Sequence, residues 1–205
     1  MELELKRGGR TARVETLGGE LVSYRDERGL EYIWGGDPAY WPGRNPLLFP
    51  IVGMLKEGKI RFDGREYAME RHGFARRREF TPAARGEDWV RLELRESAET
   101  LALYPYSFRL AVEQRLTDTG FSTAVTVANP GEGPLPFCLG AHTGFRCPLE
   151  AGERFEDYEL VFPERESCPT LLLRDGLLDR PAALPCLEDT DTLPLDYRWF
   201  DALDT

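Results

Sequence analysis

The sequence predicts an all-β protein, built as an antiparallel sandwich. Apolar and polar residues alternate with a period of two, turn signals recur at short intervals, and no long segment shows the 3.6-residue period of a helix. A chain of 205 residues suits one all-β unit. We therefore expect a single domain over residues 1–205.

The predicted strands follow one another along the chain. From the N-terminus they cover residues 3–6, 10–15, 20–25, 31–34, 59–62, 66–69 and 89–94. The clearest alternation comes next, on even positions of 109–116 and odd positions of 121–127. Asp63-Gly64 and Asp118-Thr119-Gly120 lie between such runs and predict hairpin turns. The last predicted strand covers residues 157–162.

Two segments predict long loops. Residues 35–50 are rich in Gly, Pro and Trp, and residues 163–194 combine several prolines with mixed charge. Long irregular segments on a β-scaffold are often functional, and disorder is the alternative explanation for both.

Composition excludes several classes of function. A net charge of −10 disfavours binding to nucleic acid or anionic lipid. The first residues lack the apolar run of a signal peptide, and no segment is apolar for the length of a membrane span. None of the four cysteines forms a C-x-x-C pair. We expect a cytoplasmic protein with reduced thiols, and neither nucleic acid nor membrane as a partner.

Both histidines of the chain have glycine and aromatic neighbours. Gly73 and Phe74 follow His72, and Thr143-Gly144-Phe145 follows His142. Glycine allows a ligand to approach the backbone closely, and aromatic rings suit the apolar faces of a sugar. The alternative is an ordinary polar residue at a strand end. Two scattered histidines are too few for a cupin-like metal site, so we expect no metal and no cofactor.

Several blocks of the sequence together resemble the aldose 1-epimerase family, in its lactose-operon-associated and hexose-phosphate mutarotase-like branch. Their order and spacing agree across nearly the whole chain: residues 45–53, 63–67, 71–76, 140–145 with 147–149, and 155–158. The resemblance implies the galactose-mutarotase-like β-sandwich, also called a supersandwich. It also implies a mutarotase, which interconverts the α and β anomers of an aldose or sugar phosphate.

The resemblance also implies roles for individual residues. His142 would be the acid that protonates the ring oxygen, and His72 would hydrogen-bond the sugar near that oxygen. Arg76 and Arg71 would bind substrate hydroxyls or an anionic group such as phosphate. The alternative for this arginine-rich segment is a solvated edge paired with neighbouring glutamates.

The sequence departs from the family pattern in two places. Met54 stands where the family often has a substrate-binding arginine. The family also continues beyond Thr205, so the resemblance implies a sandwich that lacks its final strands and the glutamate that acts as base. Asp204, or else Asp201, would be the substrate-binding aspartate. Exposed strand edges would then favour self-association. The alternative function is a sugar-binding protein without turnover, or a truncated remnant.

Overall fold

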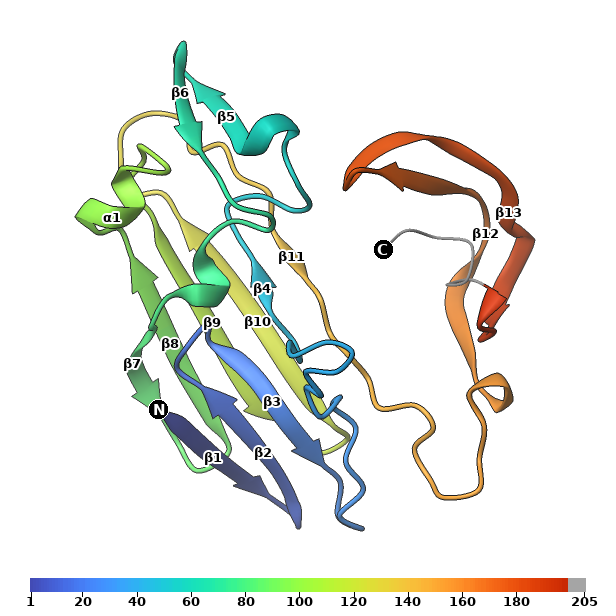
Figure 1. Cartoon of the computed structure of the whole chain (residues 1–205). Coiled ribbons are helices and arrows are strands. Elements are labelled where there is room, and N and C mark those ends of the chain that lie inside the picture. The colour runs from blue at the N-terminus through green and yellow to red at the C-terminus, as the bar shows by residue number, and fades with distance from the viewer. Residues whose placement is uncertain (199–205) are drawn as a thin grey trace. The chain divides into compact units, whose positions relative to one another are not determined.

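The computed structural model describes residues 1–198 (Figure 1). The chain divides into two compact units, of which the first is Met1–Arg146 and the second begins at Cys147. The single domain expected over residues 1–205 stays a prediction. Asp201 and Asp204 lie outside the described residues.

Two antiparallel sheets form the first unit. The three-stranded sheet has the order β1-β2-β3, with β1 (Glu2–Arg7), β2 (Arg10–Glu15) and β3 (Glu20–Arg25). The four-stranded sheet has the order β10-β9-β8-β7, with β7 (Thr81–Arg85), β8 (Trp89–Arg95), β9 (Arg109–Leu116) and β10 (Phe121–Ala128).

The core lies between these sheets. The three-stranded sheet contributes Leu3, Leu5, Ala12 and Val14, and β8 and β9 contribute Val90, Leu92, Leu110 and Val112; all are buried in one cluster. The even positions of β9 are buried, as the alternation predicts. Two sheets that share one core confirm the predicted sandwich.

Short elements complete the first unit. They are β4 (Leu47–Leu48), β5 (Lys59–Phe62), β6 (Arg65–Ala68), β11 (Gly140–Ala141), the helix α1 (Ala98–Leu101), and the 3₁₀ turns η1 (Lys56–Gly58) and η2 (Ala75–Arg77). β4 pairs with β11, and β5 pairs with β6. Asp63 and Gly64 have φ of 47° and 80°, as a two-residue hairpin turn requires, so this predicted turn is confirmed.

The second unit corrects the expected loop over residues 163–194. After the 3₁₀ turn η3 (Phe155–Asp157), β12 (Glu159–Arg174) and β13 (Leu177–Pro194) form an antiparallel ribbon. The prolines that suggested a loop are tolerated, because each strand of a two-stranded ribbon has an outward edge and the register shifts repeatedly.

The strand expected at residues 31–34 is also wrong. Only isolated bridges occur there, from Glu31 to Arg25 and from Ile33 to Phe145. The Glu31 carboxylate accepts the backbone N–H groups of Tyr24 (2.9 Å) and Ile33 (3.1 Å). A side chain therefore takes donors that a longer strand would have used in its ladder.

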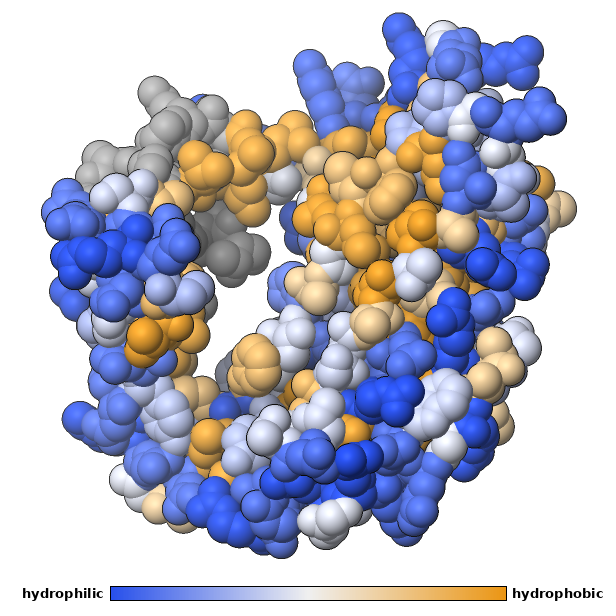
Figure 2. All heavy atoms as spheres, turned by 180° about the vertical axis from the view of Figure 1, so that it is seen from behind, coloured by the Kyte–Doolittle hydropathy of each residue, from blue (hydrophilic) through white to orange (hydrophobic). Residues whose placement is uncertain are grey.

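Some large apolar side chains of the first unit are exposed. They include Val52, Phe137 and Leu139, which are 49%, 44% and 40% exposed. Figure 2 shows hydrophobic residues gathered on one face of this unit. No helix among residues 1–198 is long and apolar enough to cross a membrane.

Candidate functional site

His142 follows directly after β11. Its backbone N–H donates to the carbonyl oxygen of Pro46 at 3.2 Å, and the N–H of Gly144 donates to the carbonyl of Arg44 at 2.6 Å. The ladder between β4 and β11 therefore continues past the named strands into the segment 142–144. The imidazole of His142 is exposed.

His72 lies in the turn between β6 and η2, and Gly53 fixes its ring. The N–H of His72 donates to the carbonyl of Gly53 at 2.8 Å, and the N–H of Gly53 donates to Nδ1 of His72 at 3.0 Å. An Nδ1 that accepts a hydrogen bond carries no proton, so the neutral ring is protonated on Nε2. His72 can therefore donate a hydrogen bond through Nε2.

The two predicted histidines lie together with a tryptophan. The ring centroids of His72 and His142 are 6.0 Å apart, and the ring of Trp41 lies 4.9 Å from that of His142. The sequence predicts a long loop over residues 35–50, of a kind that is often functional, but it does not single out Trp41. A Cβ at Gly144 would lie 2.8 Å from the Trp41 ring, so this glycine allows the close approach.

Burial and charge lower the pKa of His72 below its ordinary value of 6.5. The largest cause is loss of contact with water, and the positive charges of Arg76, His142 and Arg71 follow. A neutral imidazole is therefore favoured at His72 near neutral pH. This protonation state is the one that the hydrogen bond from Gly53 requires.

The arginine-rich segment separates into paired and unpaired cations. Arg77 binds the neighbouring Glu70 at 2.5 Å, which agrees with the solvated-edge alternative, whereas Arg78 binds the more distant Glu99. Arg71 and Arg76 have no carboxylate partner among the side chains that the structure describes. Nη2 of Arg76 donates to the backbone carbonyl of Arg71 at 2.9 Å.

Arg76 carries a polar atom without a partner. Its Nε is buried and makes no hydrogen bond within the described part of the chain. Burial is also the first cause that lowers the pKa of this guanidinium, with Arg77 second. A buried N–H donor and a cation near His72 suit an acceptor oxygen of a ligand.

Three further residues, Met54, Asp201 and Asp204, are named by the sequence analysis for this site. Met54 follows Gly53, the residue that fixes His72, and supplies no charge there. Asp201 and Asp204 remain predictions. Within residues 1–198, no three His, Cys, Asp or Glu side chains gather closely enough to hold a metal ion.

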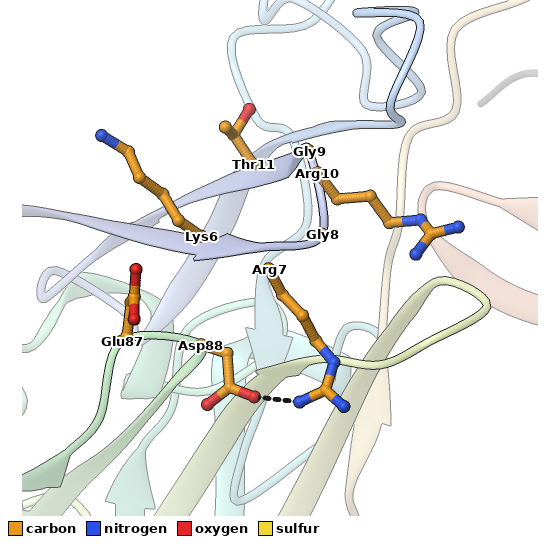
Figure 3. Close-up of a pocket in the computed structure, with 8 residues that line it drawn as sticks. All are labelled: Lys6, Arg7, Gly8, Gly9, Arg10, Thr11, Glu87 and Asp88. Atoms are coloured by element: carbon orange, nitrogen blue, oxygen red, sulfur yellow. Dashed lines mark hydrogen bonds and ion pairs between the residues drawn. The ribbon is translucent and has the colours of Figure 1, made fainter.

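A separate cavity of about 610 Å³ lies at the β1–β2 hairpin (Figure 3). Lys6, Arg7 and Arg10 line it, but each is already paired with a carboxylate. Arg7 bridges Asp88 and Asp118, and so joins three turns of the first unit. Neither histidine lines this cavity, and its cations are paired with carboxylates, so His72 and His142 remain the candidate site.

The fold agrees with the comparison to known families. The family model described as aldose 1-epimerase matches residues 1–178. This chain belongs to the aldose 1-epimerase family, and its class of function is that of a sugar epimerase or mutarotase.

Individual relatives support this assignment. The plasmid-encoded protein LacX of Lactococcus lactis subsp. lactis is 41% identical over 208 residues, which cover 98% of this chain and 70% of LacX. A galactose mutarotase-like protein from Lactobacillus casei ATCC 334 is 30% identical with a TM-score of 0.84, over 97% of this chain and 68% of that one. A galactose mutarotase related enzyme from Lactobacillus acidophilus is 27% identical with a TM-score of 0.89, over 99% and 68%.

Proposed function

We propose that this protein catalyses mutarotation of an aldose, with His142 as the general acid and His72 as a hydrogen-bond donor to the sugar. A base removes the proton of the C1 hydroxyl, the C1–O5 bond breaks, and its electron pair goes to O5, which His142 protonates. Rotation about C1–C2 follows, and the reverse steps close the other anomer. Histidine suits proton transfer because its pKa lies near neutrality.

The observation that carries this proposal is the pairing of His72 with His142. The rings lie 6.0 Å apart on segments that are far apart in the sequence. The neutral, Nε2-protonated His72 is prepared to donate to an oxygen, while exposed His142 is accessible to a ligand. The Trp41 ring supplies an apolar surface for the face of a sugar.

Polarimetry tests this proposal directly. Freshly dissolved α-D-glucose or α-D-galactose should relax faster with the protein than in buffer, and His142→Asn should lose that acceleration. Cys138→Ser is the matched control, because Cys138 donates its N–H to Pro50 in the same ladder and carries no proposed role. Equal rates for His142→Asn and the unchanged chain, with equal circular dichroism, would remove His142 from the mechanism.

An anionic sugar, such as a hexose phosphate, is favoured as substrate by the two unpaired arginines. Guanidinium groups bind phosphate oxygens with charge-assisted hydrogen bonds. The positive charges of Arg76 and Arg71 act on His72, in a chain whose net charge is −10.

Arg76→Ala should therefore weaken binding of glucose 6-phosphate more than binding of glucose. Losing one charge-assisted contact predicts a roughly tenfold to hundredfold weaker phosphate affinity. Isothermal titration calorimetry with both sugars measures the difference. Arg77→Ala is the matched control, because Arg77 is already paired with Glu70. Equal losses for the two sugars in Arg76→Ala contradict a phosphate subsite.

Sugar binding without turnover is the second candidate function. One observation favours it: ring opening requires a base, and neither histidine has, among the described side chains, a hydrogen-bonded carboxylate that would raise its basicity. In that case calorimetry would detect sugar binding, while polarimetry would show no acceleration by the folded protein.

A further inference from the structure

The ladder that holds His142 is incomplete at His142 itself. The pairing of β11 with β4 continues so that His142 faces Pro46. Facing residues in such a pair normally exchange two N–H···O bonds. Pro46 has no N–H, so only the bond from His142 to Pro46 remains, and at 3.2 Å it is longer than most.

A side-chain hydrogen bond lies beside this weak point. Thr143 and Asn45 are the next facing residues, and Oγ1 of Thr143 donates to Oδ1 of Asn45 at 2.6 Å. Both line a cavity of about 160 Å³ together with buried Gln114. Since side chains alternate along a strand, this cavity lies on the opposite face from the ring of His142.

Glu20 holds Asn45 from the three-stranded sheet. Its Oε1 accepts the backbone N–H groups of Asn45 at 2.6 Å and of Arg44 at 3.1 Å. A chain of hydrogen bonds therefore runs from β3 through Asn45 to Thr143, which is adjacent to His142.

We propose that Asn45 and Thr143 are positioning residues for His142, with Glu20 as their anchor. Their hydrogen bond replaces the one that Pro46 cannot make, and it keeps the imidazole beside Trp41 and His72. This inference rests on the proposed function of His142 and assigns no chemistry to Asn45 or Thr143 themselves.

A pair of variants at Thr143 tests the role of the hydroxyl. Thr143→Val keeps the shape of the side chain but cannot donate, and kcat for mutarotation should fall about tenfold with little change in KM, because misplacement of a reacting group mainly lowers the rate. Thr143→Ser keeps the donor and should keep the rate. An undiminished kcat in Thr143→Val, or an equal loss in Thr143→Ser, would overturn the proposal.

Asn45→Ala removes the same hydrogen bond from its other end. Combined with Thr143→Val, it should slow the reaction no more than either change alone, since residues that act through one contact are not additive. Independent, multiplying losses would contradict a shared contact. Asn45→Ala also serves as the test variant if Thr143→Val does not fold, as judged by circular dichroism.

A measurement without turnover separates this inference from the proposed function. The chain has only two histidines, so His142→Asn assigns their ring protons in an NMR spectrum. The cross-relaxation between the Trp41 and His142 rings, 4.9 Å apart, should persist in Thr143→Ser and weaken in folded Thr143→Val or Asn45→Ala. If no variant catalyses mutarotation but this pattern holds, the proposed function fails and the positioning role stands. An unchanged signal in both folded variants overturns the positioning role.

Discussion

At the scale of single residues, His72 combines backbone strain with a fixed protonation state. Its φ of 67° lies in the left-handed region, which costs a residue with a Cβ about 1–2 kcal/mol. Two hydrogen bonds with Gly53 offset this cost and orient the ring. Strained residues often gather at functional sites, where the surrounding structure fixes them. The strain at His72 therefore agrees with a role in the site.

The depressed pKa of His72 predicts a dependence of stability on pH. Between the folded pKa and the ordinary value of 6.5, the unfolded chain binds more protons than the folded one. The contribution of His72 to stability is therefore complete above 6.5 and is lost as pH falls through the folded pKa. Urea unfolding across this pH range should show the decrease in the free energy of unfolding. His72→Asn should make that decrease smaller, because the titrating imidazole is gone. Asn is the suitable replacement because it tolerates positive φ. An unchanged pH slope in His72→Asn would contradict this explanation.

At the scale of elements, the segment after His72 runs parallel to the residue that follows β4 and lies very close to it. Gly73 forms an isolated parallel bridge with buried Phe49, whose carbonyl accepts N–H groups from Phe74 at 3.0 Å and Ala75 at 3.2 Å. A Cβ at Gly73 would lie 2.2 Å from that carbonyl oxygen. Glycine is therefore required there for both its φ of 70° and its lack of a side chain.

Gly73→Ala should destabilise the protein by about 3 kcal/mol or more, because the backbone must move as well as accept strain. Gly64→Ala is the control: φ there is 80°, yet no atom lies within 4 Å of the added Cβ. It should cost only about 1 kcal/mol. Chemical denaturation measures both losses, and similar values would show that the contact with Phe49 can relax.

A strand could be predicted from the sequence where its own residues show the alternating pattern, and not where only its pairing with a distant segment defines it. β8 and β9 alternate clearly, because one face of each is buried along nearly its whole length. On β10 the alternation is between half-buried positions, such as Val125, and exposed ones. β11 pairs through only two residues, which no period can reveal. β12 and β13 form despite prolines because a ribbon leaves outward edges, and an edge position cannot be recognised before the partner strand is known.

The site follows the same distinction. Local motifs and the family resemblance single out both histidines, Arg71 and Arg76 as candidates, and their roles stay predictions. The bond between Asn45 and Thr143 joins residues 98 apart in the sequence, so only the folded register brings them together. Trp41 lies in a predicted loop, and the composition of a loop does not indicate that one of its side chains will contact His142.

At the scale of the whole molecule, β10 is an edge strand that could pair with another chain. β10 ends the order β10-β9-β8-β7, so one of its edges has no neighbouring strand among the described residues. β10 carries no charged residue. Proteins usually protect such edges with charges, because an open edge can pair with another chain.

Self-association through β10 is therefore expected to increase with protein concentration. Thr126 is exposed on this strand, and Thr126→Lys should keep the protein monomeric by placing a charge on the edge. Thr119→Lys, in the turn before β10, changes net charge equally without touching the edge. Sedimentation velocity over a range of concentrations measures the result. Equal association in both variants would exclude β10 as the interface.

The long-range packing of the N-terminal sheet has a consequence during synthesis. β1 and β2 contact β9, and Gln114 donates to the carbonyl of Gly19 across 95 residues of sequence. At roughly 5–20 residues per second, a ribosome takes several seconds to reach β9 after it has made β3. The apolar face of the first sheet is uncovered for that time. The position of β9 in the sequence therefore sets how long the nascent chain depends on chaperones or on the ribosome surface for protection.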